Sequence, residues 1–79
     1  MKADRIRLYA RVGEQLRAMR ERHGRGMNEV AEALGVSRST LQKIEQGVTP
    51  CPLHLLVAFA EAFDCTLDEL VPVDVEAAE

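Results

Sequence analysis

The chain has 79 residues, of which 47% are hydrophobic and 29% charged, and its formal net charge is −3. This length and composition predict one folded domain, residues 1–79, and exclude a disordered chain. No apolar run approaches the ~20 residues of a membrane span, and the first residues lack the apolar core of a secretory signal. We therefore expect a cytoplasmic protein without a membrane partner.

Charged residues divide the chain into a basic part and an acidic part. All ten lysines and arginines lie in residues 1–50 beside six acidic residues, whereas residues 51–79 contain seven acidic residues and no lysine or arginine. The two parts carry net charges of +4 and −7. Electrostatic attraction acts over a Debye length of about 8–10 Å, so this local distribution matters more than the sum. A modestly positive side and a negative side are predicted.

The first predicted helix covers about residues 5–22. Apolar side chains recur there at intervals of three and four residues, at Ile6, Tyr9, Val12, Leu16 and Met19, which indicates one buried face. Asp4 is suited to the N-cap, and the helix is expected to end near His23 and Gly24. Residues 24–26 then form a loop.

Residues 27–46 predict two helices joined by a short turn. The first, about 27–34, is followed by Gly35, at the position where a left-handed residue is commonest. Only residues 35–37 separate it from the next helix, and a glycine-containing turn of this length is typical of a helix-turn-helix. Ser37 is a good N-cap for the second helix.

The helix after Ser37 has two different faces. At about 100° per residue, one arc is polar and the opposite side is apolar. The arc contains Arg38, Ser39, Gln42, Lys43 and Gln46, and the opposite side contains Leu41 and Ile44. This is the layout of a helix that contacts base edges in the major groove of DNA while its other side packs on a core.

Two further helices complete an all-α prediction. The segment 52–63 is apolar nearly all round, with Pro52 suited to the first helical position. One face is expected to contain Leu53, Leu56, Phe59, Ala60 and Phe63, extended by Leu55, Ala58 and Ala62. Thr66 and Glu69 form a capping box that begins a short helix near 67–71. An acidic tail, residues 72–79, follows.

Metal and catalytic chemistry are not predicted. Cys51 and Cys65 are expected to be free thiols, because disulfides are rare in cytosolic proteins. Together with His23 and His54 they match no common four-ligand zinc pattern, so we predict no metal and no cofactor. No Ser-His-Asp or Cys-His arrangement is suggested, which argues against an enzyme.

Motifs spread over residues 12–71 resemble the Cro/CI-type (XRE-type) helix-turn-helix family. They are Val12-Gly13, Leu16-Arg17, Met19-Arg20, Glu29-Val30-Ala31, Leu34-Gly35-Val36-Ser37, Ser39-Thr40-Leu41, Ile44-Glu45-Gln46-Gly47, Leu53, Ala60-Glu61-Ala62-Phe63 and Thr66-Leu67-Asp68-Glu69-Leu70. The resemblance implies a compact five-helix, lambda-repressor-like domain, with its core in residues 5–71, that usually binds operator DNA as a dimer.

The resemblance also implies roles for single residues. Base contacts fall to Arg38, Ser39 and Lys43, and a structural ion pair between the first and third helices falls to Arg20 and Glu45. Contacts to the DNA backbone fall to Ser37, Thr40, Gln42 and Gln46. Arg17 and Arg25, from the first helix and the loop after it, are expected to compensate where this sequence lacks a contact of the family. The sequence departs from the family at Gly26 and Met27, where Ser and Gln are frequent, and at residues 48–50, which lack the usual basic residue. Two backbone contacts are therefore missing.

Two functions remain open at this point. The first is a sequence-specific transcriptional regulator, a repressor that binds a pseudo-palindromic operator in double-stranded DNA as a homodimer. The predicted dimer interface contains Leu55, Ala58, Ala62, Val71 and Val73. The alternative is a protein–protein module, such as an antitoxin subunit that neutralises a partner toxin. Excess apolar surface on residues 52–63 and the acidic pI of about 5.3 favour this second reading.

Overall fold

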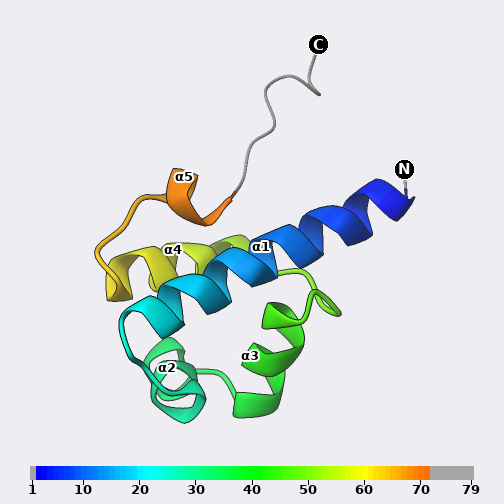
Figure 1. Ribbon diagram of the computed structural model, residues 1–79. Coiled ribbons are helices and arrows are strands. Elements are labelled where there is room, and N and C mark those ends of the chain that lie inside the picture. Colours follow the sequence, from blue (N-terminus) through cyan, green and yellow to red (C-terminus); the bar gives the residue numbers. More distant parts are fainter. Residues whose placement is uncertain (1, 72–79) are drawn as a thin grey trace.

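Five helices make up the part of the chain that this computed structural model describes, residues 2–71 (Figure 1). They are α1 (Lys2–Arg22), α2 (Met27–Leu34), α3 (Arg38–Glu45), α4 (Leu53–Ala62) and α5 (Leu67–Leu70). No strand occurs within these residues, which confirms the all-α, five-helix prediction. None of the helices described is long and apolar enough to cross a membrane.

The connection between α2 and α3 is built as the sequence predicts. Gly35 has a left-handed backbone with φ of 74°, and its N–H donates to the carbonyl of Glu32 at 3.1 Å. The N–H of Val36 donates to the carbonyl of Ala31 at 3.0 Å, which completes a Schellman motif. Ser37 then caps α3. These local bonds set the short turn that separates the two helices.

Each helix contributes to one hydrophobic core. In Figure 1, α1 crosses the molecule with α2 and α3 below it and α5 above it. Helix α1 packs against α3 and α5, α2 packs against α3 and α4, and α4 packs against α5. The most deeply buried large side chains are Leu16, Leu41, Phe59 and Leu70. The C-terminal ends of α1 and α4 also meet, where the rings of His23 and Phe63 lie 4.9 Å apart, edge to face.

Two predicted helix starts are wrong. Helix α1 begins at Lys2, so Asp4 lies within its first turn instead of at the N-cap. Helix α4 begins at Leu53, and Pro52 is its N-cap with an extended backbone (φ −61°, ψ 151°) rather than its first helical residue. A proline ring fits this position equally well because φ near −65° is common to the helix and to the extended region.

The orientation of α4 also differs from the prediction. Leu53, predicted on the same face as Phe59, is 68% exposed, whereas Leu55, predicted on the dimer surface, is only 8% exposed and belongs to the core. The buried face is centred near Phe59. At about 100° per residue, Leu55 lies about 40° from Phe59 around the helix axis and Leu53 about 120° from it. Leu55 is therefore not free to contact a second chain.

Candidate nucleic-acid interface

Helix α3 presents the polar arc to solvent. Arg38, Ser39, Thr40, Gln42 and Lys43 are exposed. Leu41 and Ile44, on the opposite side, and Glu45, at the edge of the arc, are buried against the core. Within residues 2–71, the side chains of Arg38, Ser39, Gln42 and Lys43 have no hydrogen-bond partner. Their donors and acceptors are therefore open to a ligand.

Ser37 and Thr40 are occupied by the helix cap. The Ser37 hydroxyl oxygen accepts a hydrogen bond from the Thr40 backbone N–H at 3.0 Å. The Ser37 hydroxyl also donates to Thr40 Oγ1 at 2.8 Å. Since the Thr40 oxygen accepts in this pair, its own hydroxyl hydrogen stays free to donate outward. Of these two predicted backbone-contact residues, Thr40 retains the better donor.

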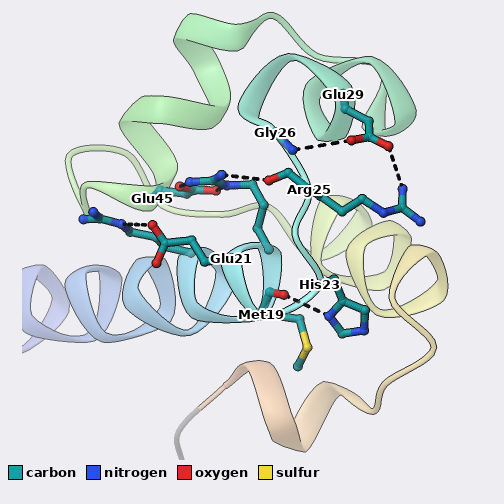
Figure 2. Close-up of polar contacts among 9 residues, drawn as sticks. Met19, Glu21, His23, Arg25, Gly26, Glu29 and Glu45 are labelled. Atoms are coloured by element: carbon teal, nitrogen blue, oxygen red, sulfur yellow. Dashed lines mark hydrogen bonds and ion pairs between the residues drawn. The ribbon is translucent and has the colours of Figure 1, made fainter.

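An ion pair between Arg20 and Glu45 holds α3 to α1. Arg20 Nε lies 2.8 Å from Glu45 Oε2, and Arg20 Nη2 lies 3.1 Å from Oε1. The two side chains are only 11% and 3% exposed. Arg20 Nη1 also donates to the carbonyl of Arg25 at 3.0 Å, which attaches the loop after α1 (Figure 2). The hydrogen bond to Glu45 raises the pKa of Arg20 although its burial opposes the shift.

A surface hollow of about 270 Å³ lies beside this ion pair. It is lined by Arg17, Arg20, Met27, Gln42, Glu45 and Gln46. The structure thus brings together Arg17, Gln42 and Gln46, three residues that the sequence assigns to backbone contacts. Met27, which the sequence marks only as a missing contact, is a half-buried part of the wall. Its place depends on how α2 meets α3, which no local signal reveals.

Arg17 and Arg25 are each engaged in an exposed ion pair. Arg17 Nε lies 3.2 Å from Glu21 Oε2, and Arg25 Nη1 lies 3.1 Å from Glu29 Oε2. Both pairs join residues four apart (Figure 2). Exposed pairs of this kind contribute only about 0.2–1 kcal/mol to stability. A phosphate group can therefore compete for either arginine at little cost.

The cysteines have perturbed acidities and no disulfide. Cys51 and Cys65 are free and half-buried. Burial raises the pKa of Cys51 to about 11. Burial, with smaller contributions from the charges of Glu69 and Asp64, raises the pKa of Cys65. In residues 2–71, no three histidine, cysteine or acidic side chains are grouped so as to hold a metal ion.

Comparison with known proteins decides the family. A family model described as a helix-turn-helix domain matches residues 11–72. The chain belongs to the Cro/CI-type helix-turn-helix family. This is a family of helix-turn-helix domains and not of enzymes. The matched residues include the glycine turn before Ser37, α3 and the Arg20–Glu45 pair of this chain.

Solved structures share the fold of this family member. The restriction-modification controller protein C.AhdI from Aeromonas hydrophila is 27% identical, with a TM-score of 0.74 over 78% of this chain and 94% of that one. The clp gene regulator ClgR from Corynebacterium glutamicum is 32% identical, with a TM-score of 0.74 over 90% and 88%. The P22 c2 repressor, solved with a synthetic operator, is 27% identical, with a TM-score of 0.71 over 80% and 96%.

Curated relatives are several times longer. A protein of Thermococcus kodakarensis, provisionally named as an HTH-type transcriptional regulatory protein, is 42% identical over 78 residues, which are 98% of this chain and 24% of the relative. A protein of Pyrococcus horikoshii with the same kind of name is 39% identical over 74 residues, 92% of this chain and 23% of the relative. The chain therefore spans about a quarter of the relatives it matches.

Proposed function

We propose that the chain is a single helix-turn-helix domain that binds double-stranded DNA sequence-specifically, as part of a cytoplasmic transcriptional regulator. The exposed polar arc of α3 carries this proposal, because Arg38 and Lys43 lie there without a partner within residues 2–71. The names of the longer relatives and of the operator-bound neighbour support it.

Base recognition falls to the outer side of α3. Arg38 and Lys43 can donate to O6 and N7 of guanine, and Ser39 can donate or accept at a neighbouring base. A well-formed bidentate contact is worth about 1–3 kcal/mol of discrimination between base pairs. With these three residues, one copy of α3 reads a short half-site.

Backbone contacts fall to the residues around the hollow. Gln42 on α3 and Gln46 at its C-cap supply amide donors. Arg17 supplies a charge from α1 once it leaves Glu21. Thr40 and Arg25 extend the contact on either side, and Ser37 contributes mainly by holding Thr40. Met27 offers only an apolar surface, so affinity depends strongly on these few groups and on avidity.

The proposal includes a homodimer, because the two halves of a pseudo-palindromic operator match the two-fold symmetry of a dimer. Binding of this dimer to its operator would repress transcription. Ala62 is exposed and Ala58 and Val71 are half-buried, so these three predicted interface residues remain accessible. Leu55 is not among them, and Val73 lies outside the described residues. Two α3 helices in such a dimer would contact half-sites about 34–36 Å apart.

Site selection from a random duplex library at two salt concentrations tests the proposal. The expected result is one enriched motif with two half-sites. It should be bound less tightly at higher salt, because the release of counterions from the DNA then gains less free energy. The double variant Arg38→Ala/Lys43→Ala should lose preference for that motif. Arg7→Ala/Arg11→Ala is the matched control, because it removes the same charge from exposed positions of α1. Equal loss of preference in both variants would contradict reading by α3.

A protein–protein module is the second candidate, favoured by one observation. Leu53 and Val57, one helical turn apart on α4, are both exposed, and adjacent exposed apolar residues favour a docking partner. A toxin bound by an antitoxin subunit is one partner of this kind. If this function stands alone, no duplex is enriched at low salt. If it accompanies DNA binding, Leu53→Glu should leave the selected motif unchanged.

A further inference from the structure

A glycine in the middle of α1 lies against the end of α3. Gly13 is buried, and a methyl group at this position would lie 2.5 Å from the carbonyl oxygens of both Ile44 and Glu45. Glycine is a poor helix former compared with alanine. Here the missing side chain lets the last-turn carbonyls of α3 reach the backbone of α1, so that the two helices touch without an intervening side chain.

A second glycine makes the same kind of contact one turn away. Gly47 follows α3 with φ of 77°, and a methyl group there would lie 2.6 Å from Cα and 3.0 Å from N of Ala10. Helix α3 is therefore held to α1 at three levels: Gly47 on Ala10, the α3 carbonyls on Gly13, and Glu45 on Arg20. Ala10 and Arg20 are about 15 Å apart along α1 at 1.5 Å per residue.

Three contacts along one helix fix both the tilt and the rotation of the other. Figure 1 shows the C-terminal end of α3 directed at α1, while its N-terminal end lies away from α1. Helix α3 begins at Arg38. A displacement of the α3 C-terminal end at Gly13 would therefore tilt α3 and move its N-terminal end. The polar arc would move although none of its residues had changed.

We infer that Gly13 is a positioning residue for sequence recognition: by admitting the α3 carbonyls to the backbone of α1, it sets the orientation in which Arg38, Ser39 and Lys43 meet the bases. This inference rests on the proposed function of α3. A methyl group at Gly13 must move from 2.5 Å to about 3.4 Å, where ordinary contact begins, and both neighbours are backbone atoms that cannot rotate aside.

Specificity responds to such a shift more than general affinity does. Bidentate base contacts need matched positions of two donors and two acceptors. Phosphate contacts from long side chains tolerate displacement and carry no sequence information. Gly13→Ala removes no charge, so the dependence of binding on salt, which reports the number of phosphates neutralised, should not change.

The experiment compares affinities for the selected duplex and for an unrelated duplex of equal length. Gly13→Ala is expected to lower their ratio on the order of tenfold, the loss of about one base contact, with the salt slope unchanged. Residual dipolar couplings should show a changed angle between α3 and α1. Phe63→Leu, a core substitution at the C-cap of α4, serves as a stability control and should lower the melting temperature without changing the ratio.

A matched pair of glycine substitutions provides the second measurement, which decides the matter if Gly13→Ala does not fold. Gly47→Ala and Gly24→Ala both place alanine at a left-handed position, with φ of 77° and 67°, but only Gly47 has neighbours within 4 Å. Gly47→Ala should lower the affinity ratio and Gly24→Ala should not.

Each outcome bears on one claim. A folded Gly13→Ala chain with the original ratio and the original α3 angle overturns the inference, as does an equal effect of Gly47→Ala and Gly24→Ala. A changed angle with an unchanged ratio also overturns it, because orientation would then not determine recognition. If the unsubstituted chain prefers no duplex at all, the proposed function fails. The residual dipolar couplings still test the structural part in that case: an unchanged angle between α3 and α1 in Gly13→Ala would reject the contact at Gly13 as a determinant of α3 orientation.

Discussion

Arg20 and Glu45 form a two-bond ion pair, at 2.8 and 3.1 Å, across the contact between α1 and α3. The Glu45 side chain is 3% exposed, so it depends on Arg20 for the compensation of its charge. Burial alone would disfavour a carboxylate there. The same guanidinium reaches the carbonyl of Arg25 and so joins two helices and a loop in one polar cluster.

Removal of Arg20 should therefore be costly. Arg20→Ala leaves a buried carboxylate without a partner, for which the expected loss in the free energy of unfolding is about 3–5 kcal/mol. Urea denaturation at pH 7 measures this quantity. Arg17→Ala is the control, because it breaks an exposed pair with Glu21 on the same helix and should cost less than about 1 kcal/mol. Equal losses in the two variants would show that the buried Arg20–Glu45 pair stabilises the fold no more than the exposed Arg17–Glu21 pair does.

Substitution of the two leucines at the start of α4 should change the free energy of unfolding by very different amounts. Leu55→Ala creates a cavity in the core and is expected to cost about 2–5 kcal/mol. Leu53→Ala changes an exposed side chain and should stay within about 0.5 kcal/mol of the unsubstituted protein. Thermal and urea unfolding of both variants measure the difference. A larger loss for Leu53→Ala would restore the helix orientation that the sequence pattern predicts.

This reversal marks the limit of prediction from the sequence. Helix α2, the turn and α3 could be predicted because Gly35 and Ser37 are local signals and α3 has strongly different faces. Helix α4 is apolar nearly all round, so its periodicity contains too little contrast to orient it. The pattern places Leu53 with Phe59 and Leu55 at the dimer surface, whereas the structure exposes Leu53 and buries Leu55.

The contacts between helices are equally hidden in the sequence. The close approach at Gly13 and the hollow beside Met27 depend on how distant segments pack, which spacing along the chain does not encode. The Arg20–Glu45 pair was predictable only because the resemblance implied it. Contact of Arg38, Ser39 and Lys43 with bases remains a prediction.

Cys51 should make stability depend on alkaline pH. Burial raises the pKa of its thiol from 9.0 to about 11 in the folded protein. Between these values the unfolded chain releases the proton while the folded chain keeps it, so the free energy of unfolding falls as pH rises from 9 towards 11. The contribution is fully present below pH 9 and is lost as pH passes the folded pKa.

Comparison with Cys51→Ala isolates this effect from other groups that titrate above pH 9. Urea denaturation at pH 8, 9, 10 and 11 should show a steeper loss of stability for the unsubstituted chain than for the variant. Alkylation provides an independent measurement, because the thiolate is the reactive form. Cys51 should react slowly at pH 8. Parallel stability profiles would contradict the raised pKa.

Two serines at the start of α3 should separate folding from recognition. Ser37 accepts the Thr40 N–H at 3.0 Å, so Ser37→Ala removes the helix cap and is expected to cost about 0.5–2 kcal/mol. Ser37→Gly should recover most of that loss, because glycine caps nearly as well.

Ser39 is exposed without a partner within residues 2–71, so Ser39→Ala should change stability by less than about 0.5 kcal/mol. Ser39→Ala should instead alter the preferred base at one position of each half-site, as measured by repeated site selection, whereas Ser37→Ala should leave that preference intact in the folded fraction. An unchanged motif with Ser39→Ala would remove Ser39 from the set of base-contacting residues.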